Sequence, residues 1–279
     1  MAGQTQRPET VFHPELLAGK VVVISGGGSG LGRALVLAMA KLGAKIAICG
    51  RRQEPLDETA RLVAEQGGAP VFAKAMSIRD PEAVNAFFDD VYAHFGTVDI
   101  LVNNAGGQFA QAAIDFSVKG WNAVVDTNLN GTWWMMQAAA RRWRDRDLPG
   151  SIVNVVAVVW RGLPGIAHSC AARAGVVYLS KTVAIEWAPL NIRVNCVAAG
   201  AIATAGLETY SDEARRELPR SNLMQRFGET RDVTDAVIYL ASASGSFVTG
   251  EALVVDGGNQ IWGDQWTIPR PAYFGGPAV

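Results

Sequence analysis

A short segment in the second half of the chain brings together three side chains that could move a proton or hold an anion. Ser169 and Arg173 are four positions apart, which places both side chains on one face of a helix. Arginine can hydrogen-bond ribose hydroxyls and supply a positive field, but it keeps its proton. The neighbouring His168 is the one group of this segment that titrates near physiological pH. All three are candidate catalytic residues, with a structural hydrogen bond as the other interpretation of His168.

A run of glycines directly after an apolar stretch carries the clearest binding signal. Residues 21–25 indicate a buried strand, the sequence from Gly26 to Gly32 follows at once, and a helical pattern begins at Arg33. Glycines allow a tight turn and let the backbone approach a pyrophosphate, whose charge is met by N–H groups at the start of the helix. The motif predicts a dinucleotide site. Its expected contacts are Ser25, Gly26, Ser29, Gly30, Leu31 and Gly32.

The end of the second predicted strand bears on which dinucleotide is bound. It reads from Ile48 to Arg52, with two arginines and no carboxylate. A carboxylate there binds the ribose 2′-hydroxyl of NAD, whereas arginine accommodates the 2′-phosphate of NADP. Arg51 and Arg52 therefore predict NADP(H) as the cofactor.

Short apolar runs alternate with longer helical patterns along the chain. This alternation predicts a doubly wound α/β fold, a single Rossmann-type domain whose seven-stranded parallel sheet has helices on both faces. The predicted strands are 21–25, 45–49, 70–75, 98–102, 151–156, 193–197 and 252–255. We expect one domain over residues 1–279, with an N-terminal extension at 1–15 and an irregular tail at 259–279. Gln108 and Trp160 follow strands, so they are placed to line a substrate pocket at the edge where such sheets bind ligands.

Composition limits the other classes of function. The chain of 279 residues is 49% hydrophobic and 18% charged, with a net charge of -1, which gives no electrostatic reason to expect nucleic acid. It lacks a run of about 18 apolar residues to span a bilayer and a signal-peptide pattern, so we expect a cytoplasmic protein that does not bind membranes. Cys49, Cys170 and Cys196 form no CxxC pair, so neither a disulfide framework nor a metal site is expected.

The motifs together resemble those of the short-chain dehydrogenase/reductase family. The glycine spacing, residues 103–106, Asn128 within 127–131 and residues 256–258 carry the likeness, which extends over roughly residues 15–260. The resemblance implies a nicotinamide cofactor, a small-molecule substrate and a homotetramer. The further cofactor contacts that it implies are Asn104, Ala105, Gly106, Arg173, Gly200, Ile202 and Thr204.

The proton-transfer group of that family is altered here. In the family, a serine after the fifth strand and a tyrosine on the next helix polarise the reacting oxygen, and a lysine four residues further on lowers the pKa of the tyrosine. The corresponding positions hold Ala157 (or Val156), Ser169 and Arg173. An asparagine is the fourth catalytic residue of the family, and it alone is kept here, as Asn128. Because serine is far less acidic than tyrosine, a carbonyl reduction that relies on a tyrosine and lysine relay is not expected.

Several segments are similar to one branch of the family, the peroxisomal trans-2-enoyl-CoA reductases and, more distantly, the 2,4-dienoyl-CoA reductases. The likeness is carried by residues 102–109, 119–124, 150–154, 168–169, 171–175 and 194–198. It implies NADPH-dependent reduction of a carbon–carbon double bond conjugated to the thioester of an acyl-CoA. Negative charge then develops on the thioester oxygen, so the protein needs hydrogen-bond donors there rather than a tuned base. Ser169, Asn128 or a backbone N–H would donate, and His168 or water would deliver the Cα proton.

Three functions stay open from the sequence. The first is an NADP(H)-dependent oxidoreductase that acts on a trans-2-enoyl-CoA or a similar activated alkene. The second is a catalytically inactive subunit that binds nucleotide or an active paralogue in a mixed oligomer, which the altered catalytic residues favour. The third is an alcohol or carbonyl oxidoreductase for a hydrophobic acyl or terpenoid substrate.

Overall fold

The computed structural model describes residues 10–209 and 211–261. Most of the predicted N-terminal extension and of the predicted C-terminal tail therefore lies outside the described residues. The described part of the extension, residues 10–15, leads into Leu17. Leu17 is buried, and its N–H donates to the carbonyl of Leu42 at 2.9 Å.

Seven parallel strands form one sheet at the centre of the molecule, in the order β3-β2-β1-β4-β5-β6-β7. They are β1 (Val21–Ser25), β2 (Lys45–Gly50), β3 (Phe72–Ala75), β4 (Ile100–Asn103), β5 (Gly150–Ala157), β6 (Ile192–Ala199) and β7 (Ala252–Val255). The predicted fold class is confirmed, and each strand overlaps its predicted range. All residues of β1 are buried, as expected of a strand that is covered on both faces.

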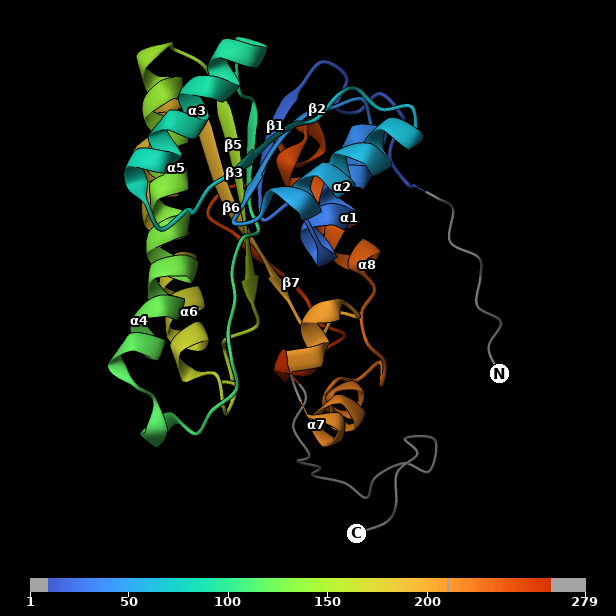
Figure 1. The fold of residues 1–279 in the computed structure, drawn as a ribbon, viewed down its shortest axis with the longest axis vertical. Coiled ribbons are helices and arrows are strands. Elements are labelled where there is room, and N and C mark those ends of the chain that lie inside the picture. The colour runs from blue at the N-terminus through green and yellow to red at the C-terminus, as the bar shows by residue number, and fades with distance from the viewer. Residues whose placement is uncertain (1–9, 210, 262–279) are drawn as a thin grey trace.

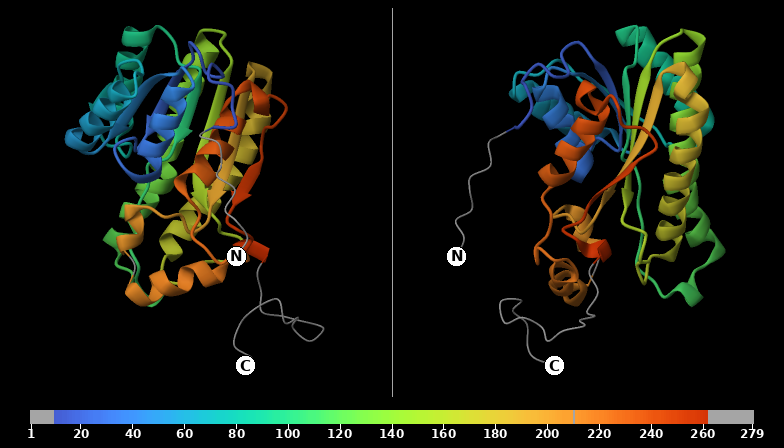
Figure 2. Two further views of the ribbon diagram at one scale, coloured as in Figure 1. Left: turned by 90° about the vertical axis from the view of Figure 1, so that its right-hand side faces the viewer. Right: turned by 180° about the vertical axis from the view of Figure 1, so that it is seen from behind.

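Helices cover both faces of the sheet, as Figures 1 and 2 show. One layer contains α1 (Gly30–Lys41), α2 (Gln53–Glu65) and α8 (Thr230–Ala241), and the other contains α3 (Pro81–Phe95), α5 (Gly131–Asp145) and α6 (Ala167–Trp187). The shorter α4 (Val118–Val125) packs on α6, and α7 (Asp212–Glu217) lies at the lower end of the view. Short 3-10 turns occupy Ala113–Asp115, Ala188–Leu190, Ala205–Thr209, Leu218–Ser221, Ala243–Gly245 and Asn259–Ile261.

The core lies between the sheet and each helix layer, and close contacts fix where the helices sit. Trp143 of α5 is fully buried and donates its indole N–H to the carbonyl of Val98 at 2.6 Å. A Cβ at Gly150 would lie 2.3 Å from the Trp143 ring, so the first position of β5 must be glycine for α5 to pack this closely. α5 is thereby held against β5, the strand that precedes the helix with His168, Ser169 and Arg173.

The strand order reverses between β1 and β4, which are neighbours in the sheet although β2 and β3 come between them in sequence. Connections from these two strands leave toward opposite sides, which opens a crevice at their carboxyl ends. The glycine run follows β1 and residues 104–109 follow β4. Both segments are thus brought to one crevice by topology.

Within the described part of the chain, no helix is both long enough and apolar enough to cross a membrane.

Candidate functional site

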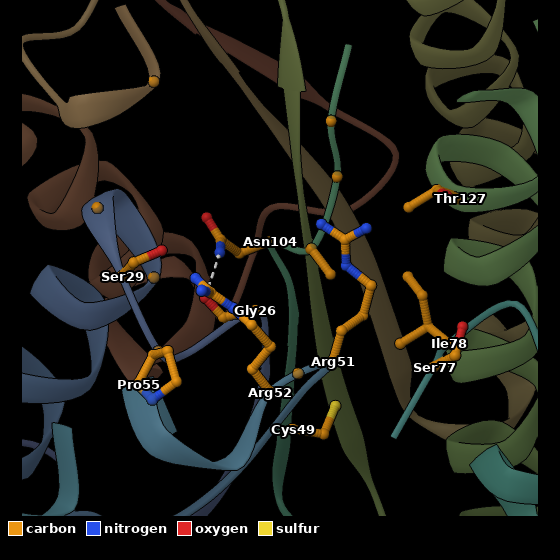
Figure 3. A pocket seen from close by; sticks show the side chains of 18 of the residues that line it. Gly26, Ser29, Cys49, Arg51, Arg52, Pro55, Ser77, Ile78, Asn104 and Thr127 are labelled. Atoms are coloured by element: carbon orange, nitrogen blue, oxygen red, sulfur yellow. Dashed lines mark hydrogen bonds between the residues drawn. The ribbon is translucent and has the colours of Figure 1, made fainter. Parts of the chain in front are cut away.

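A cavity of about 620 Å³ occupies the crevice beyond β1 and β4. Figure 3 shows it from close by, with the glycine turn on one side and the helix that carries Thr127 on the other. Its size suits a ligand of dinucleotide class. The N-terminus of α1 faces this cavity through Ser29 and Gly30, and the first turn of the helix has no acidic residue. Unpaired N–H groups at such a terminus attract phosphate.

The glycines of the turn are needed for its conformation and its packing. Gly26 and Gly30 have φ of 71° and 51°, a region that side chains rarely adopt. A Cβ at Gly32 would lie 2.0 Å from the carbonyl oxygen of Gly26. The sequence therefore folds into a turn whose backbone is exposed to a ligand, and the residues present fit a bound pyrophosphate.

Hydrogen bonds join this turn to the segment after β4. The Ser25 hydroxyl accepts from the N–H groups of Asn104 and Ala105, both at 3.1 Å. The Asn104 side-chain amide donates to the carbonyls of Ser25 and Gly26, each at 3.2 Å. Ser25 is fully buried and does not line the cavity. Its role is to hold the two walls together, while Asn104 and Ala105 form part of the wall.

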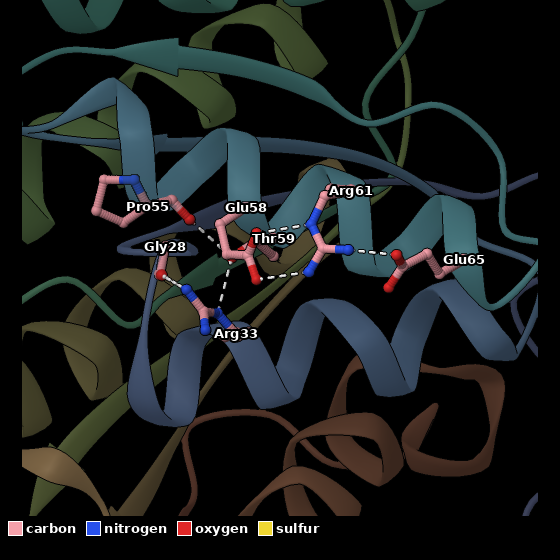
Figure 4. Close-up of polar contacts among 7 residues, drawn as sticks. All are labelled: Gly28, Arg33, Pro55, Glu58, Thr59, Arg61 and Glu65. Carbon is pink, nitrogen blue, oxygen red and sulfur yellow. Dashed lines mark hydrogen bonds and ion pairs between the residues drawn. The ribbon is translucent and has the colours of Figure 1, made fainter.

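A second network braces the same turn from α2 (Figure 4). Arg33 donates to the carbonyl of Gly28 at 2.7 Å and to the hydroxyl of Thr59 at 3.1 Å. The Thr59 hydroxyl in turn donates to the carbonyl of Pro55 at 3.0 Å. The Gly28 carbonyl is thereby held by Arg33 of α1, which α2 anchors through Thr59.

Two arginines stand at the end of β2 without acidic partners. Arg51 and Arg52 line the cavity and are exposed, and neither forms an ion pair within the described ranges. In Figure 3 the Arg51 side chain lies between the Gly26 turn and the helix of Thr127, and the Arg52 side chain overlaps the turn in this view. Cys49 also lines the cavity, where burial raises the pKa of its thiol to about 12. The positive charge at this end of the cavity is therefore available to an anionic ligand.

The helix that carries Asn128 is interrupted by one π-helical turn, Asp126–Asn130, between α4 and α5. Such turns are rare and occur often at functional sites. Here it brings the fully buried Asn128 side chain onto the backbone of Gly107. Its Oδ1 accepts from the Gly107 N–H at 2.9 Å and its Nδ2 donates to the Gly107 carbonyl at 3.0 Å. Asn128 thus fixes the cavity wall at Gly107.

Ser169 extends this contact into a row of three polar side chains. Its buried hydroxyl accepts from Nδ2 of Asn128 at 3.3 Å and donates to Oε1 of Gln108 at 2.7 Å. Gln108 lines the cavity, whereas Asn128 and Ser169 do not. Gln108 is therefore the member of the row that borders the cavity.

His168 lies beside this row in an aromatic pocket. Its Nδ1 accepts from the N–H of Ser169 at 2.8 Å, so the neutral ring carries its proton on Nε2. Nε2 is buried without a hydrogen-bond partner among the described residues. The rings of Phe109 and Phe116 lie 4.6 and 4.4 Å from the imidazole, and burial lowers the pKa of His168. His168 does not line the cavity, whereas Phe109, which packs against its ring, does.

Arg173 lies behind the cavity wall rather than in it. Its Nη1 donates to the carbonyl of Val155 in β5 at 2.9 Å, and the residue does not line the cavity. Burial lowers the pKa of the guanidinium to about 10, so it remains charged at neutral pH.

Most of the predicted cofactor residues line one cavity. They are Gly26, Ser29, Gly30, Leu31, Gly32, Arg51, Arg52, Asn104, Ala105, Gly106 and Thr204. Ile202 lines a second cavity of about 360 Å³, and Gly200 packs on Asp256, where a Cβ would lie 2.8 Å from the Asp256 Cα. Trp160 is exposed and lines neither cavity.

Sequence reasoning missed several residues of the site. Thr127 and Phe109 line the cavity, and Phe116 completes the pocket around His168. The helical periodicity before Asn128 could have indicated that Thr127 faces the cavity, but the π-helical turn changes that periodicity. Phe109 and Phe116 stand in a segment without regular periodicity, so no pattern in the sequence marked them.

The fold and the cavity define a dinucleotide-binding α/β protein, and known proteins specify the family. The model of the family described as Enoyl-(Acyl carrier protein) reductase matches residues 26–260. A probable 2,4-dienoyl-CoA reductase of Bacillus subtilis is 35% identical over 257 residues, covering 90% of this chain and 98% of that protein. The 3beta-hydroxysteroid dehydrogenase 1 of Eggerthella lenta is 38% identical over 253 residues, covering 88% and 95%.

A solved structure is similarly close. The citronellol catabolism dehydrogenase of Pseudomonas aeruginosa PAO1 superposes with a TM-score of 0.81 at 36% identity, covering 91% of this chain and all 100% of that one. The chain therefore belongs to the short-chain dehydrogenase/reductase family. It is an oxidoreductase of that type and uses a nicotinamide cofactor.

The burial of His168 predicts a specific acid sensitivity. Because its pKa is lowered in the folded state, the unfolded state binds the extra proton first as the pH falls below about 6.5. The free energy of unfolding should then decrease by up to about 1.4 kcal/mol per pH unit from this group. His168→Gln should remove that slope in urea titrations at several pH values. The exposed His13 offers a control, His13→Gln, and an equal slope in both variants would contradict the assignment.

Proposed function

We propose that the chain is an NADP(H)-dependent oxidoreductase that reduces the carbon–carbon double bond of a trans-2-enoyl-CoA or a similar activated alkene. The observation that carries this proposal is the polar row Asn128, Ser169 and Gln108 at the wall of a cavity that no described tyrosine lines. Reduction of an enoyl thioester requires stabilisation of negative charge on the thioester oxygen. It does not require the tuned phenol that an alcohol or ketone requires.

Gln108 is the group that we assign to the thioester oxygen. Its Oε1 accepts the hydroxyl proton of Ser169, which fixes the amide plane and directs the amide nitrogen away from Ser169. Asn128 holds Ser169 and Gly107 in place at the same time. A donor that is already oriented stabilises developing charge without the cost of reorganisation.

The rest of the reaction follows from the cavity. Bound NADPH would supply the hydride that adds to Cβ of the substrate. The glycine turn and Asn104 to Gly106 would hold it, with Arg51 and Arg52 at the 2′-phosphate. Water that enters with the substrate is the first source of the Cα proton. His168 is the second, and it would reach the substrate only if Phe109 moved aside.

An oligomer of this chain is also part of the proposal. Tyr178 and Ile185 on α6 are 72% and 78% exposed, and the ammonium of Lys181 lies over the Tyr178 ring at 5.5 Å. Because α6 carries Ser169 and Arg173, pairing of this exposed face with a second copy would stiffen that helix. We propose a homo-oligomer, a tetramer as the sequence implies.

A carbonyl or alcohol oxidoreductase is the second candidate. The hydroxysteroid dehydrogenase relative, at 38% identity, favours it because its name gives an alcohol as substrate. An inactive subunit of a mixed oligomer would bind nucleotide with the same cavity residues, so it is distinguished from the enzyme by activity and not by the cavity.

The proposed reaction can be tested with the purified chain alone. It should oxidise NADPH when a trans-2-enoyl-CoA is added, as followed by the absorbance of the reduced cofactor. Gln108→Ala should lower kcat by roughly 10²–10³, the usual effect of removing one oriented donor. Gln111→Ala is the matched control, because the Gln111 amide donates to the Asp115 carbonyl outside the cavity.

Two results would contradict the proposed reaction. Turnover of a ketone or alcohol but not of the enoyl-CoA would favour the carbonyl oxidoreductase. Activity that appears only when a related active subunit is added would favour the mixed oligomer.

The cofactor assignment has its own test. Arg51→Asp should weaken NADPH binding by about 10- to 100-fold, the effect of losing one charged hydrogen bond, and should improve binding of NADH. Arg144→Asp is the control, since Arg144 pairs with Asp145 on the surface. Fluorescence titration with both cofactors gives the two dissociation constants. An unchanged preference in the Arg51 variant would refute the assignment to the 2′-phosphate.

A further inference from the structure

Exposed apolar side chains gather on one segment beside the cavity, residues 109–121. Ile114 and Val118 are 93% and 78% exposed, and Phe109 and Trp121 are exposed as well. The segment contains the 3-10 turn Ala113–Asp115 and the first residues of α4, which lies at the lower left of Figure 1. Large apolar side chains that cluster on a protein surface mark binding sites more often than scattered ones do. This surface is therefore suited to an apolar ligand.

A row of aromatic rings connects this surface to the cavity. Phe109 is the only aromatic residue among the described residues that line the cavity. The ring of Phe116 lies 5.6 Å from that of Phe109, and the ring of Trp121 lies 6.4 Å from that of Phe116. Neither Phe116 nor Trp121 lines the cavity. The row thus begins at the cavity wall and ends at an exposed side chain of α4.

Contacts with other elements hold the row in place. The buried ring of His168 on α6 lies 4.6 Å from the Phe109 ring and 4.4 Å from the Phe116 ring. Between these two phenylalanines, the N–H of Gln111 donates to the carbonyl of Gly165 in the loop after β5 at 2.9 Å. A surface that is ordered before the ligand arrives loses little side-chain freedom on binding.

The charges of the segment fit the same kind of ligand. Asp115 and Lys119 are its only charged residues, one of each sign. The segment therefore offers no cluster of like charge that would attract a phosphate, a carboxylate or a charged protein surface. An uncharged hydrocarbon chain is the ligand that matches both the rings and the low charge.

We propose that this surface binds the hydrocarbon tail of the substrate, and that the substrate is a medium- or long-chain acyl thioester. The inference rests on the proposed function, in which Gln108 binds the thioester oxygen. Gln108 and Phe109 are consecutive and both line the cavity, so an acyl chain that starts at Gln108 meets the Phe109 ring first. We name this surface the acyl track, and it consists of Phe109, Ile114, Phe116, Val118 and Trp121.

Binding of saturated acyl-CoAs tests the acyl track without any turnover. Each CH₂ that leaves water for a fully apolar site strengthens binding about fourfold, and a track open to solvent on one side should give about twofold. Dodecanoyl-CoA should therefore bind roughly 100-fold more tightly than butanoyl-CoA. Isothermal titration calorimetry of the full chain with NADP⁺ present measures both dissociation constants.

A charged substitution on the acyl track locates the effect. Val118→Asp places a carboxylate beside the bound tail and should weaken dodecanoyl-CoA binding by about tenfold, with butanoyl-CoA and NADPH binding unchanged. The variant should fold, because the Val118 side chain is largely exposed. Val11→Asp is the matched control, since Val11 is a similarly exposed valine outside the track.

The possible failures of this test differ from one another. Equal affinity for the two chain lengths, or the same chain-length preference in the two aspartate variants, would overturn the acyl track alone. Absence of binding at every chain length would contradict the thioester substrate of the proposed function and overturn the track with it. A lower molar mass of Val118→Asp in light scattering, with unchanged dodecanoyl-CoA affinity, would also overturn the track and identify the surface as an interface between copies of the chain.

Discussion

The hydrogen bonds between the ends of β1 and β4 are the constraint on which the rest of the site depends. Ser25 and Asn104 join the glycine turn to the wall after β4, and Gly32 leaves the space in which the Asn104 amide sits, since a Cβ there would lie 2.6 Å from its nitrogen. Topology alone only brings these strands together. The hydrogen bonds set the distance between the phosphate-binding turn and the wall that carries Gly106 and Gln108.

The segment after β4 continues from Asn104 to Gln108. Gly106, Gly107 and Gln108 are each contacted there by a side chain that does not line the cavity. The π-helical turn places Asn128 on Gly107, Ser169 on α6 holds Gln108, and Arg173 lies against Gly106. Asn128, Ser169 and Arg173 stand at positions of the family's proton-transfer residues, and here they have a common structural effect. They orient the backbone and one amide toward the cavity, which suits a substrate that gains negative charge on oxygen.

The sequence predicted the fold well, because buried strands and a glycine turn are local patterns with a strong physical cause. Gly26, Gly30, Gly32 and Arg51 line one cavity, and their contacts with a cofactor stay a prediction. The catalytic half was harder to predict. The spacing of Ser169 and Arg173 indicated one helix face, but whether a side chain reaches the cavity depends on contacts between distant segments, such as Gly106 with Arg173 and His168 with Phe116. Trp160 follows a strand as expected but lies outside the cavity, because strand order does not determine the path of the following loop.

We propose that this site stabilises negative charge on a thioester oxygen while hydride adds to the neighbouring double bond. The most direct measurement uses NADPH deuterated at the transferable position, a trans-2-enoyl-CoA, and mass spectrometry with NMR of the product. We expect a saturated acyl-CoA that carries deuterium at Cβ. Deuterium on a carbinol carbon formed from a 3-oxoacyl or steroid ketone, with the enoyl-CoA left unreacted, would contradict it.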